Sequence, residues 1–154
     1  MTIHPETLGK TKLIKNLDPF FNFLKGIKDT KLIFTAPNAD MENQKIFNKI
    51  KKFVKKNSSK SLLVNSLGHK LYLSLARHCN LIIGNSSSGI IEIPSLNIPT
   101  INIGDRQTGR IRSNSVIDCK TELKEFKKAV RKGLSNKFLK KIKTYGNPYF
   151  KKQS

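Results

Sequence analysis

The segment Asn80–Arg110, NLIIGNSSSGIIEIPSLNIPTINIGDRQTGR, determines the fold class that the sequence predicts. Its apolar run 81–83 ends at Gly84 and is followed at once by asparagine and serines, a pattern typical of a buried parallel strand that stops at a ligand-binding loop. A short helix is expected from Ile90, limited by the prolines that follow, and then a second strand at 100–103. Strand, loop, helix and strand together predict one βαβ unit.

The loop NSSSG at 85–89 contains the residue types of an anion-binding site. A helix that begins just after the serines directs free backbone N–H groups and the positive end of its dipole toward the crevice, and hydroxyls such as those of Ser86 and Ser87 add donors. Such a place suits a phosphate or pyrophosphate. Arg106, after the next strand, is expected to bind the same anion, and Glu92 to accept hydrogen bonds from ribose hydroxyls. An ordinary serine-capped helix and a surface arginine remain an alternative on pattern alone.

The rest of the chain alternates strand and helix patterns in the same way, which predicts an α/β protein with a parallel sheet flanked by helices in three layers. Asp18 and Pro19 predict an N-cap and a first helical residue, with the helix continuing to Ile27. The carboxyl ends of parallel strands share one edge of the sheet, where ligands bind. Further strands are expected at 31–35, 61–65 and 115–118, and further helices at about 40–57, 69–78, 122–133 and 137–144.

Three motifs resemble a known protein family: GNSSSGIIEIPS at 84–95, PTINIGDRQTGR at 99–110 and SVIDC at 115–119. They are similar to the C-terminal half of the hydrolysing UDP-N-acetylglucosamine 2-epimerases, which make N-acetylmannosamine for sialic acid and related sugars. The resemblance covers nearly the whole chain, from His4 to the Asn-Pro-Tyr motif at 147–149. The related non-hydrolysing enzymes usually have His-Arg where this chain has histidine and proline, which favours the hydrolysing branch.

The resemblance implies a GT-B fold, built from two Rossmann-like domains with the active site in the cleft between them. A chain of 154 residues is long enough for one such domain only. Residues 1–154 are therefore expected to form a single UDP-binding domain, with the N-terminal epimerase domain missing and both ends shortened. The implied reaction eliminates UDP from UDP-N-acetylglucosamine and adds water to the resulting 2-acetamidoglucal. Its acids come from the missing domain, so the chain alone is expected to be inactive unless a partner chain or self-association completes the cleft.

The resemblance also assigns site residues. His4 is expected near the diphosphate and the reacting sugar as a catalytic residue, although a lone histidine near a terminus is more often a surface residue. From the residues alone, Asn38 and Ser66 are ordinary turn residues. His69 and His78 match no motif and are expected on the surface or as caps. No metal and no cofactor are expected. The implied contacts with UDP are Asn38, Ser66, Ser86, Ser87, Glu92 and Arg106.

Thirty lysines and arginines against ten acidic residues give a net charge of +20, which by itself indicates a polyanion partner such as RNA, or an anionic membrane. The lysines of the predicted helix 40–57, however, leave an apolar stripe between them, which favours a solvated face. No aromatic-rich RNA-binding motif accompanies them. A basic nucleotide- or RNA-binding module, or an inactive gene fragment, is the alternative function. Two cysteines without metal-type spacing and the lack of a secretory pattern predict a cytoplasmic protein.

Overall fold

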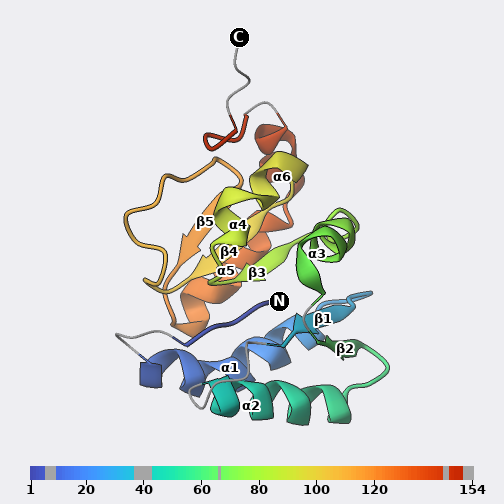
Figure 1. The fold of residues 1–154 in the computed structure, drawn as a ribbon. Coiled ribbons are helices and arrows are strands. Elements are labelled where there is room, and N and C mark those ends of the chain that lie inside the picture. The colour runs from blue at the N-terminus through green and yellow to red at the C-terminus, as the bar shows by residue number, and fades with distance from the viewer. Residues whose placement is uncertain (6–9, 37–42, 66, 144–145, 151–154) are drawn as a thin grey trace.

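The computed structural model describes residues 1–5, 10–36, 43–65, 67–143 and 146–150, which form alternating strands and helices (Figure 1). None of the helices in these ranges is long and apolar enough to cross a membrane. The strands are β1 (Leu32–Thr35), β2 (Ser61–Val64), β3 (Ile82–Gly84), β4 (Thr100–Ile103) and β5 (Val116–Cys119). The helices are α1 (Lys10–Lys25), α2 (Asn43–Lys56), α3 (Gly68–Ala76), α4 (Ser88–Ile91), the 3₁₀-helix η1 (Ile93–Leu96), α5 (Leu123–Gly133) and α6 (Asn136–Ile142).

The strands form two parallel groups, β1 with β2 and β3 with β4 and β5, joined by the N-terminal segment 1–4. On one side of this segment the Thr2 N–H donates to the Ile83 carbonyl (3.0 Å), and on the other the Thr35 N–H donates to the Met1 carbonyl (3.1 Å). The order across the molecule is therefore β2, β1, segment 1–4, β3, β4, β5. This is the strand order of the Rossmann fold and confirms the predicted Rossmann-like parallel sheet.

Gly84 allows segment 1–4 to lie against β3. A Cβ atom on Gly84 would lie 1.9 Å from the Thr2 carbonyl oxygen, far inside van der Waals contact. Thr2 and Gly84 are paired in a parallel bridge at this point. The close approach of two backbones explains why a glycine stands at the end of the buried strand.

Helices cover both faces of the sheet. All residues of β4 are buried, and successive side chains point to opposite sides. Thr100 lies toward α4, because a Cβ on Gly89 would meet its Cγ2 at 2.9 Å. Ile101 lies toward α5, because a Cβ on Gly133 would meet its Cδ1 at 3.4 Å. The predicted three-layer arrangement is therefore confirmed.

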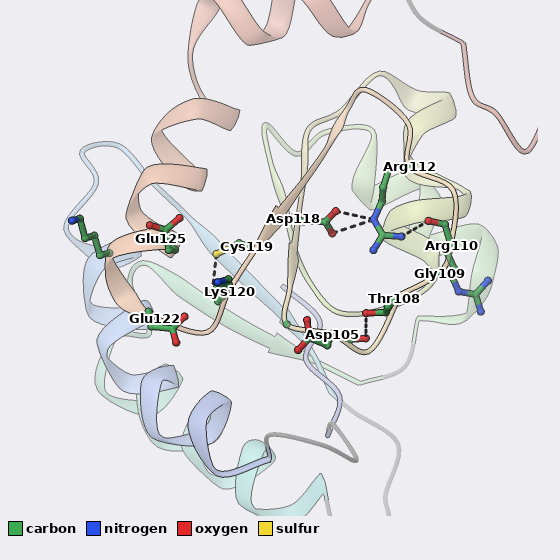
Figure 2. A pocket seen from close by; sticks show the side chains of 12 residues that line it. Asp105, Thr108, Gly109, Arg110, Arg112, Asp118, Cys119, Lys120, Glu122 and Glu125 are labelled. Atoms are coloured by element: carbon green, nitrogen blue, oxygen red, sulfur yellow. Dashed lines mark hydrogen bonds and ion pairs between the residues drawn. The ribbon is translucent and has the colours of Figure 1, made fainter.

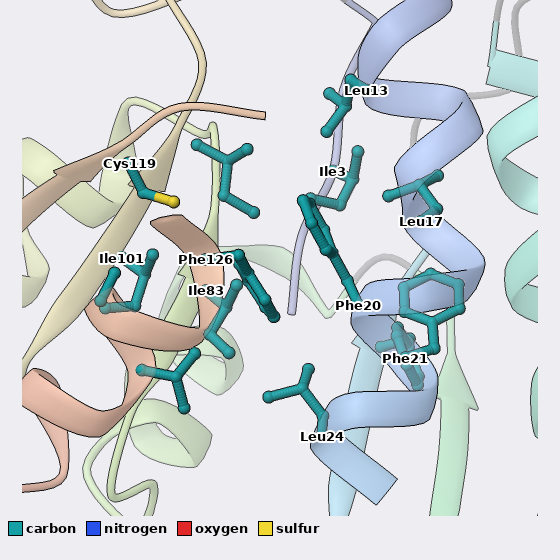
Figure 3. Packing of buried hydrophobic residues seen from close by; sticks show 14 of the residues in the cluster. Ile3, Leu13, Leu17, Phe20, Phe21, Leu24, Ile83, Ile101, Cys119 and Phe126 are labelled. Atoms are coloured by element: carbon teal, nitrogen blue, oxygen red, sulfur yellow. The ribbon is translucent and has the colours of Figure 1, made fainter. Parts of the chain in front are cut away.

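The larger apolar cluster lies between the sheet and the helices α1, α2 and α5 (Figure 3). At its centre the rings of Phe20 and Phe126 stack with centroids 4.0 Å apart, which joins α1 to α5. A smaller cluster on the other side contains Ala76, Ile93 and Ile98, from α3 and the segment around η1. The larger cluster supplies most of the hydrophobic stabilisation, since that term scales with the apolar area removed from water.

The predicted start of α1 is wrong. The helix begins at Lys10 and contains Pro19 in its interior, where a proline removes one backbone hydrogen bond. Leu13 and Leu17, both almost fully buried, extend the apolar stripe of this helix into the turns before the proline. Their burial offsets the cost of the interior proline. Asp18 does not cap the helix; its carboxylate pairs with Lys49 of α2.

Candidate functional site

The carboxyl ends of segment 1–4 and β3 lie side by side, and the chain leaves them toward opposite faces of the sheet. Segment 1–4 leads toward α1 and the larger apolar cluster, to which Ile3 belongs. β3 leads into α4, which packs on the other face against Thr100. In open parallel sheets this switch point is where ligands bind. The residues that follow the two strands therefore form the candidate site.

Asn85 joins these two strand ends. Its side chain is fully buried and hydrogen-bonds both backbone groups of one residue: the His4 N–H donates to Asn85 Oδ1 (2.7 Å), and Asn85 Nδ2 donates to the His4 carbonyl (2.8 Å). This pair of bonds fixes the position of His4 at the edge of the sheet. Sequence reasoning assigned no role to Asn85. The only signal was its place directly after the strand, at the head of the serine loop.

The backbone carbonyl of Asn85 is held from the other side by the loop after β4. Arg106 Nη1 and Gln107 Nε2 both donate to this oxygen, each at 3.0 Å. Gln107 is buried, whereas Arg106 is exposed, so the rest of its guanidinium faces solvent. The predicted residues His4 and Arg106 are thus brought together through Asn85.

The three serines of the loop are partly exposed. Ser87 is the N-cap of α4 but makes no capping hydrogen bond with its side chain, unlike an ordinary serine cap. Its carbonyl accepts from the N–H groups of Ile90 and Ile91. The N–H groups of Ser86 and Ser87 donate to no other backbone group in the described ranges. These donors remain available for an anion.

Glu92 lies at the C-cap of α4 and is held by two side chains. Its Oε1 is bonded to His69 Nε2 of α3, and its Oε2 accepts from the Ser88 hydroxyl. Burial raises the pKa of Tyr72 of α3, against a smaller opposite effect of the nearby Ser88 hydroxyl. Sequence reasoning missed the role of His69, because a contact between two helices leaves no local pattern.

Two predicted contacts, Asn38 and Ser66, lie outside the described residues. The Asn-Pro-Tyr motif near the C-terminus, by contrast, is in contact with the βαβ unit. Asn147 Nδ2 donates to the Ile91 carbonyl (2.7 Å). The Tyr149 hydroxyl donates to the Ile111 carbonyl (3.0 Å). The motif therefore ties the end of the chain to the loops around the site.

A pocket of about 1100 Å³ lies beside the candidate site rather than in it, between the loop after β4 and the start of α5 (Figure 2). Arg112 crosses it and binds the Asp118 carboxylate through Nε at 3.0 and 3.1 Å. Cys119 on its wall is not a reactive thiol, because burial raises its pKa to about 12. Of the predicted site residues that the structure describes, none lines this pocket. We place the site at the switch point because the predicted donors His4, Ser86, Ser87 and Arg106 gather there.

Comparison with known proteins identifies relatives of this chain. The family model of UDP-N-acetylglucosamine 2-epimerase matches residues 1–154. The chain is 37% identical over 155 residues to the polysialic acid biosynthesis protein P7 of Escherichia coli, covering all of this chain and 39% of that protein. It is 42% identical over 139 residues to the GDP/UDP-N,N'-diacetylbacillosamine 2-epimerase (hydrolyzing) of Campylobacter jejuni, covering 90% of this chain and 35% of that one. The chain therefore spans well under half the length of these relatives.

Solved structures share the fold. The UDP-GlcNAc 2-epimerase of Methanocaldococcus jannaschii matches with a TM-score of 0.78 at 24% identity, over 99% of this chain and 42% of that one. The same enzyme in complex with UDP-GlcNAc and UDP matches with a TM-score of 0.72 at 22% identity, over 97% and 40%. Sequence, fold and the full-length family match agree, and the chain belongs to the UDP-N-acetylglucosamine 2-epimerase family.

Proposed function

We propose that this chain is the UDP-binding part of a hydrolysing UDP-N-acetylglucosamine 2-epimerase, acting on UDP-N-acetylglucosamine or a related UDP-sugar. The observation that carries the proposal is the arrangement around Asn85, whose side chain holds His4 and whose carbonyl holds Arg106. A histidine, an arginine and a serine loop thus converge at the switch point of a Rossmann-like sheet in a chain of this family. Such a convergence fits a nucleoside diphosphate.

In this proposal the diphosphate lies over the serine loop. The free N–H groups and hydroxyls of Ser86 and Ser87 donate to its oxygens, and the exposed part of the Arg106 guanidinium adds a positive charge with directed donors. His4 lies at the adjacent strand end, where its imidazole donates to a phosphate oxygen or moves a proton. Glu92, on the far side of the serines, accepts from the ribose hydroxyls. Asn38 and Ser66 complete the nucleotide pocket in the same proposal.

These groups would assist the reaction by stabilising the leaving group. When the bond between the sugar and UDP breaks, negative charge grows on the departing diphosphate. Donors fixed in place before the reaction stabilise that charge without reorganising. Asn85 contributes indirectly, since its two bonds hold the His4 backbone and its carbonyl holds the Arg106 side chain.

The acids and bases that remove the sugar proton are proposed to come from the part of the enzyme that this chain does not contain. The chain spans 35–39% of the two curated relatives. The family resemblance implies an active site between two domains. We propose that an N-terminal Rossmann-like domain, on another chain or in a longer polypeptide, closes over the carboxyl edge of the sheet. The proline after His4 favours the hydrolysing over the non-hydrolysing reaction. The Campylobacter jejuni relative is likewise named as a hydrolysing 2-epimerase.

Calorimetric titration of the chain with UDP and with UMP tests the proposal. UDP should bind more tightly, because only UDP carries the second phosphate. Replacement of Arg106 by alanine removes a charge-assisted contact that is typically worth about 1.5–3 kcal/mol, so UDP affinity should fall by roughly one to two orders of magnitude. UMP affinity should fall less.

The matched control is Arg77→Ala. Arg77 is exposed at the C-cap of α3, the end of that helix remote from the carboxyl edge of the strands, and its removal changes the net charge by the same amount. Equal weak binding of UDP and UMP, or an equal loss in both arginine variants, would show that only overall charge attracts the nucleotide.

A further inference from the structure

The helices α3 and α4 are joined by hydrogen bonds among three side chains, with Tyr72 beside them. Glu92 bonds His69 through Oε1 and Ser88 through Oε2, and Tyr72 of α3 is close to Ser88. His69 and Tyr72 are three positions apart on α3, and Ser88 and Glu92 are four positions apart at α4, spacings that place each pair on one face of its helix. The carboxylate of Glu92 lies between His69 of one helix and Ser88 of the other and joins the two.

The network restricts Glu92 without using up its acceptors. A carboxylate has about four acceptor positions, two on each oxygen. His69 and Ser88 occupy one on each oxygen, and the Glu92 side chain is still 26% exposed. Two acceptor positions therefore remain, and their directions are fixed because both oxygens are already held. A fixed pair of acceptors matches the two neighbouring hydroxyls of a ribose.

We propose that His69 is a positioning residue that holds Glu92 ready for the ribose, so that the site prefers ribonucleotides to deoxyribonucleotides. This inference rests on the proposed function, because it takes Glu92 as the ribose contact. Ordering a free side chain on binding costs about 0.5–1.5 kcal/mol, which corresponds to a change of about 2- to 10-fold in affinity. In wild-type protein, folding already orders the Glu92 side chain. Without His69, Glu92 is ordered only when the nucleotide binds, and the cost then reduces the affinity.

A purely structural role for the His69–Glu92 pair makes a different prediction. His69 is 65% exposed, and exposed ion pairs contribute little to stability. If the pair served only to hold α3 in place, its loss would affect all nucleotides alike, whatever their sugar. The comparison between nucleotides with and without each hydroxyl therefore separates the two roles.

The test titrates UDP, 2′-deoxy-UDP and 3′-deoxy-UDP into the wild-type chain and into His69→Ala and His69→Gln, with thermal unfolding as a check on folding. We expect His69→Ala to weaken UDP binding by about 2- to 10-fold and to change the affinity of at least one deoxy analogue by less than about 2-fold. The glutamine amide can still donate to Glu92, so His69→Gln should recover part of the loss. His78→Ala is the matched control, because His78 is an exposed histidine just after α3.

A double-variant cycle keeps the inference falsifiable if one variant folds poorly. Glu92→Gln should itself reduce the preference for UDP, and adding His69→Ala to it should cause little further loss, because the two residues act together. Suppose that the wild-type chain binds UDP, but His69→Ala leaves the preference for ribose unchanged or weakens the binding of all three ligands equally. The inference on His69 is then overturned, while the proposed function still holds. If wild-type chain does not bind UDP, the proposed function fails and the inference with it.

Discussion

Replacing Asn85 with alanine removes the side chain that ties segment 1–4 to the serine loop. Two hydrogen bonds are lost, of 2.7 and 2.8 Å, and the N–H and carbonyl groups of His4 are left without these partners. An unsatisfied buried backbone group costs about 1–3 kcal/mol. His4 is only partly buried, so water can compensate to some extent, and we expect a loss of about 2–4 kcal/mol in the free energy of unfolding. That is a large share of the about 5–15 kcal/mol typical of a domain.

Urea denaturation followed by circular dichroism measures this loss. The matched control is Asn16→Ala, because Asn16 is a partly exposed asparagine of α1 whose Nδ2 donates to the Lys12 carbonyl. It should change stability by no more than about 0.5 kcal/mol. UDP affinity should also fall in Asn85→Ala, since His4 is no longer fixed. A decrease in unfolding free energy below about 1 kcal/mol would mean that Asn85 does not hold this edge of the sheet.

Gly84→Ala should destabilise the chain by about 3 kcal/mol or more in thermal unfolding, because the new Cβ would lie 1.9 Å from the Thr2 carbonyl oxygen. The control Gly146→Ala should be nearly neutral, because no atom lies within 4 Å of the position of its Cβ. Burial lowers the pKa of the Met1 amine from 8.0 to about 6 in the 154-residue chain. The folded state then binds fewer protons than the unfolded state between these values. Stability should therefore be full above pH 8, lower by about 2.3 kcal/mol at pH 6 and lower by about 2.7 kcal/mol well below pH 6; a flat profile would contradict this. ATP should compete poorly with UDP at moderate salt, whereas strong RNA binding that falls steeply with salt would favour the polyanion-binding alternative. The chain alone should not convert UDP-N-acetylglucosamine, because general acid–base catalysis, worth about 10²–10⁴-fold in rate, is expected from an N-terminal partner domain. Release of UDP and N-acetylmannosamine by the purified chain would refute this.

The elements that the sequence predicts best are those whose pattern is complete within a few residues. The βαβ unit was predicted from the apolar run before Gly84, the serine loop and the second strand, and β3 and β4 pair in parallel as expected. The start of α1 could not be predicted in the same way. Asp18 and Pro19 form a strong local signal for a helix start, but burial of Leu13 and Leu17 against the rest of the molecule outweighs it.

The contacts that organise the candidate site depend on strand order, which no local pattern specifies. His4 and Asn85 are 81 positions apart in the chain. They meet because segment 1–4 lies next to β3, and the pairing of Thr2 with Gly84 makes the two strands end at the same level. The Rossmann strand order places segment 1–4, the first strand of the chain, next to β3, the fourth. Applied to the sequence, it predicts that the polar residues directly after these two strands are neighbours. The bond between His69 and Glu92 could not be predicted even from strand order. It depends on the angle between α3 and α4, which side-chain packing sets.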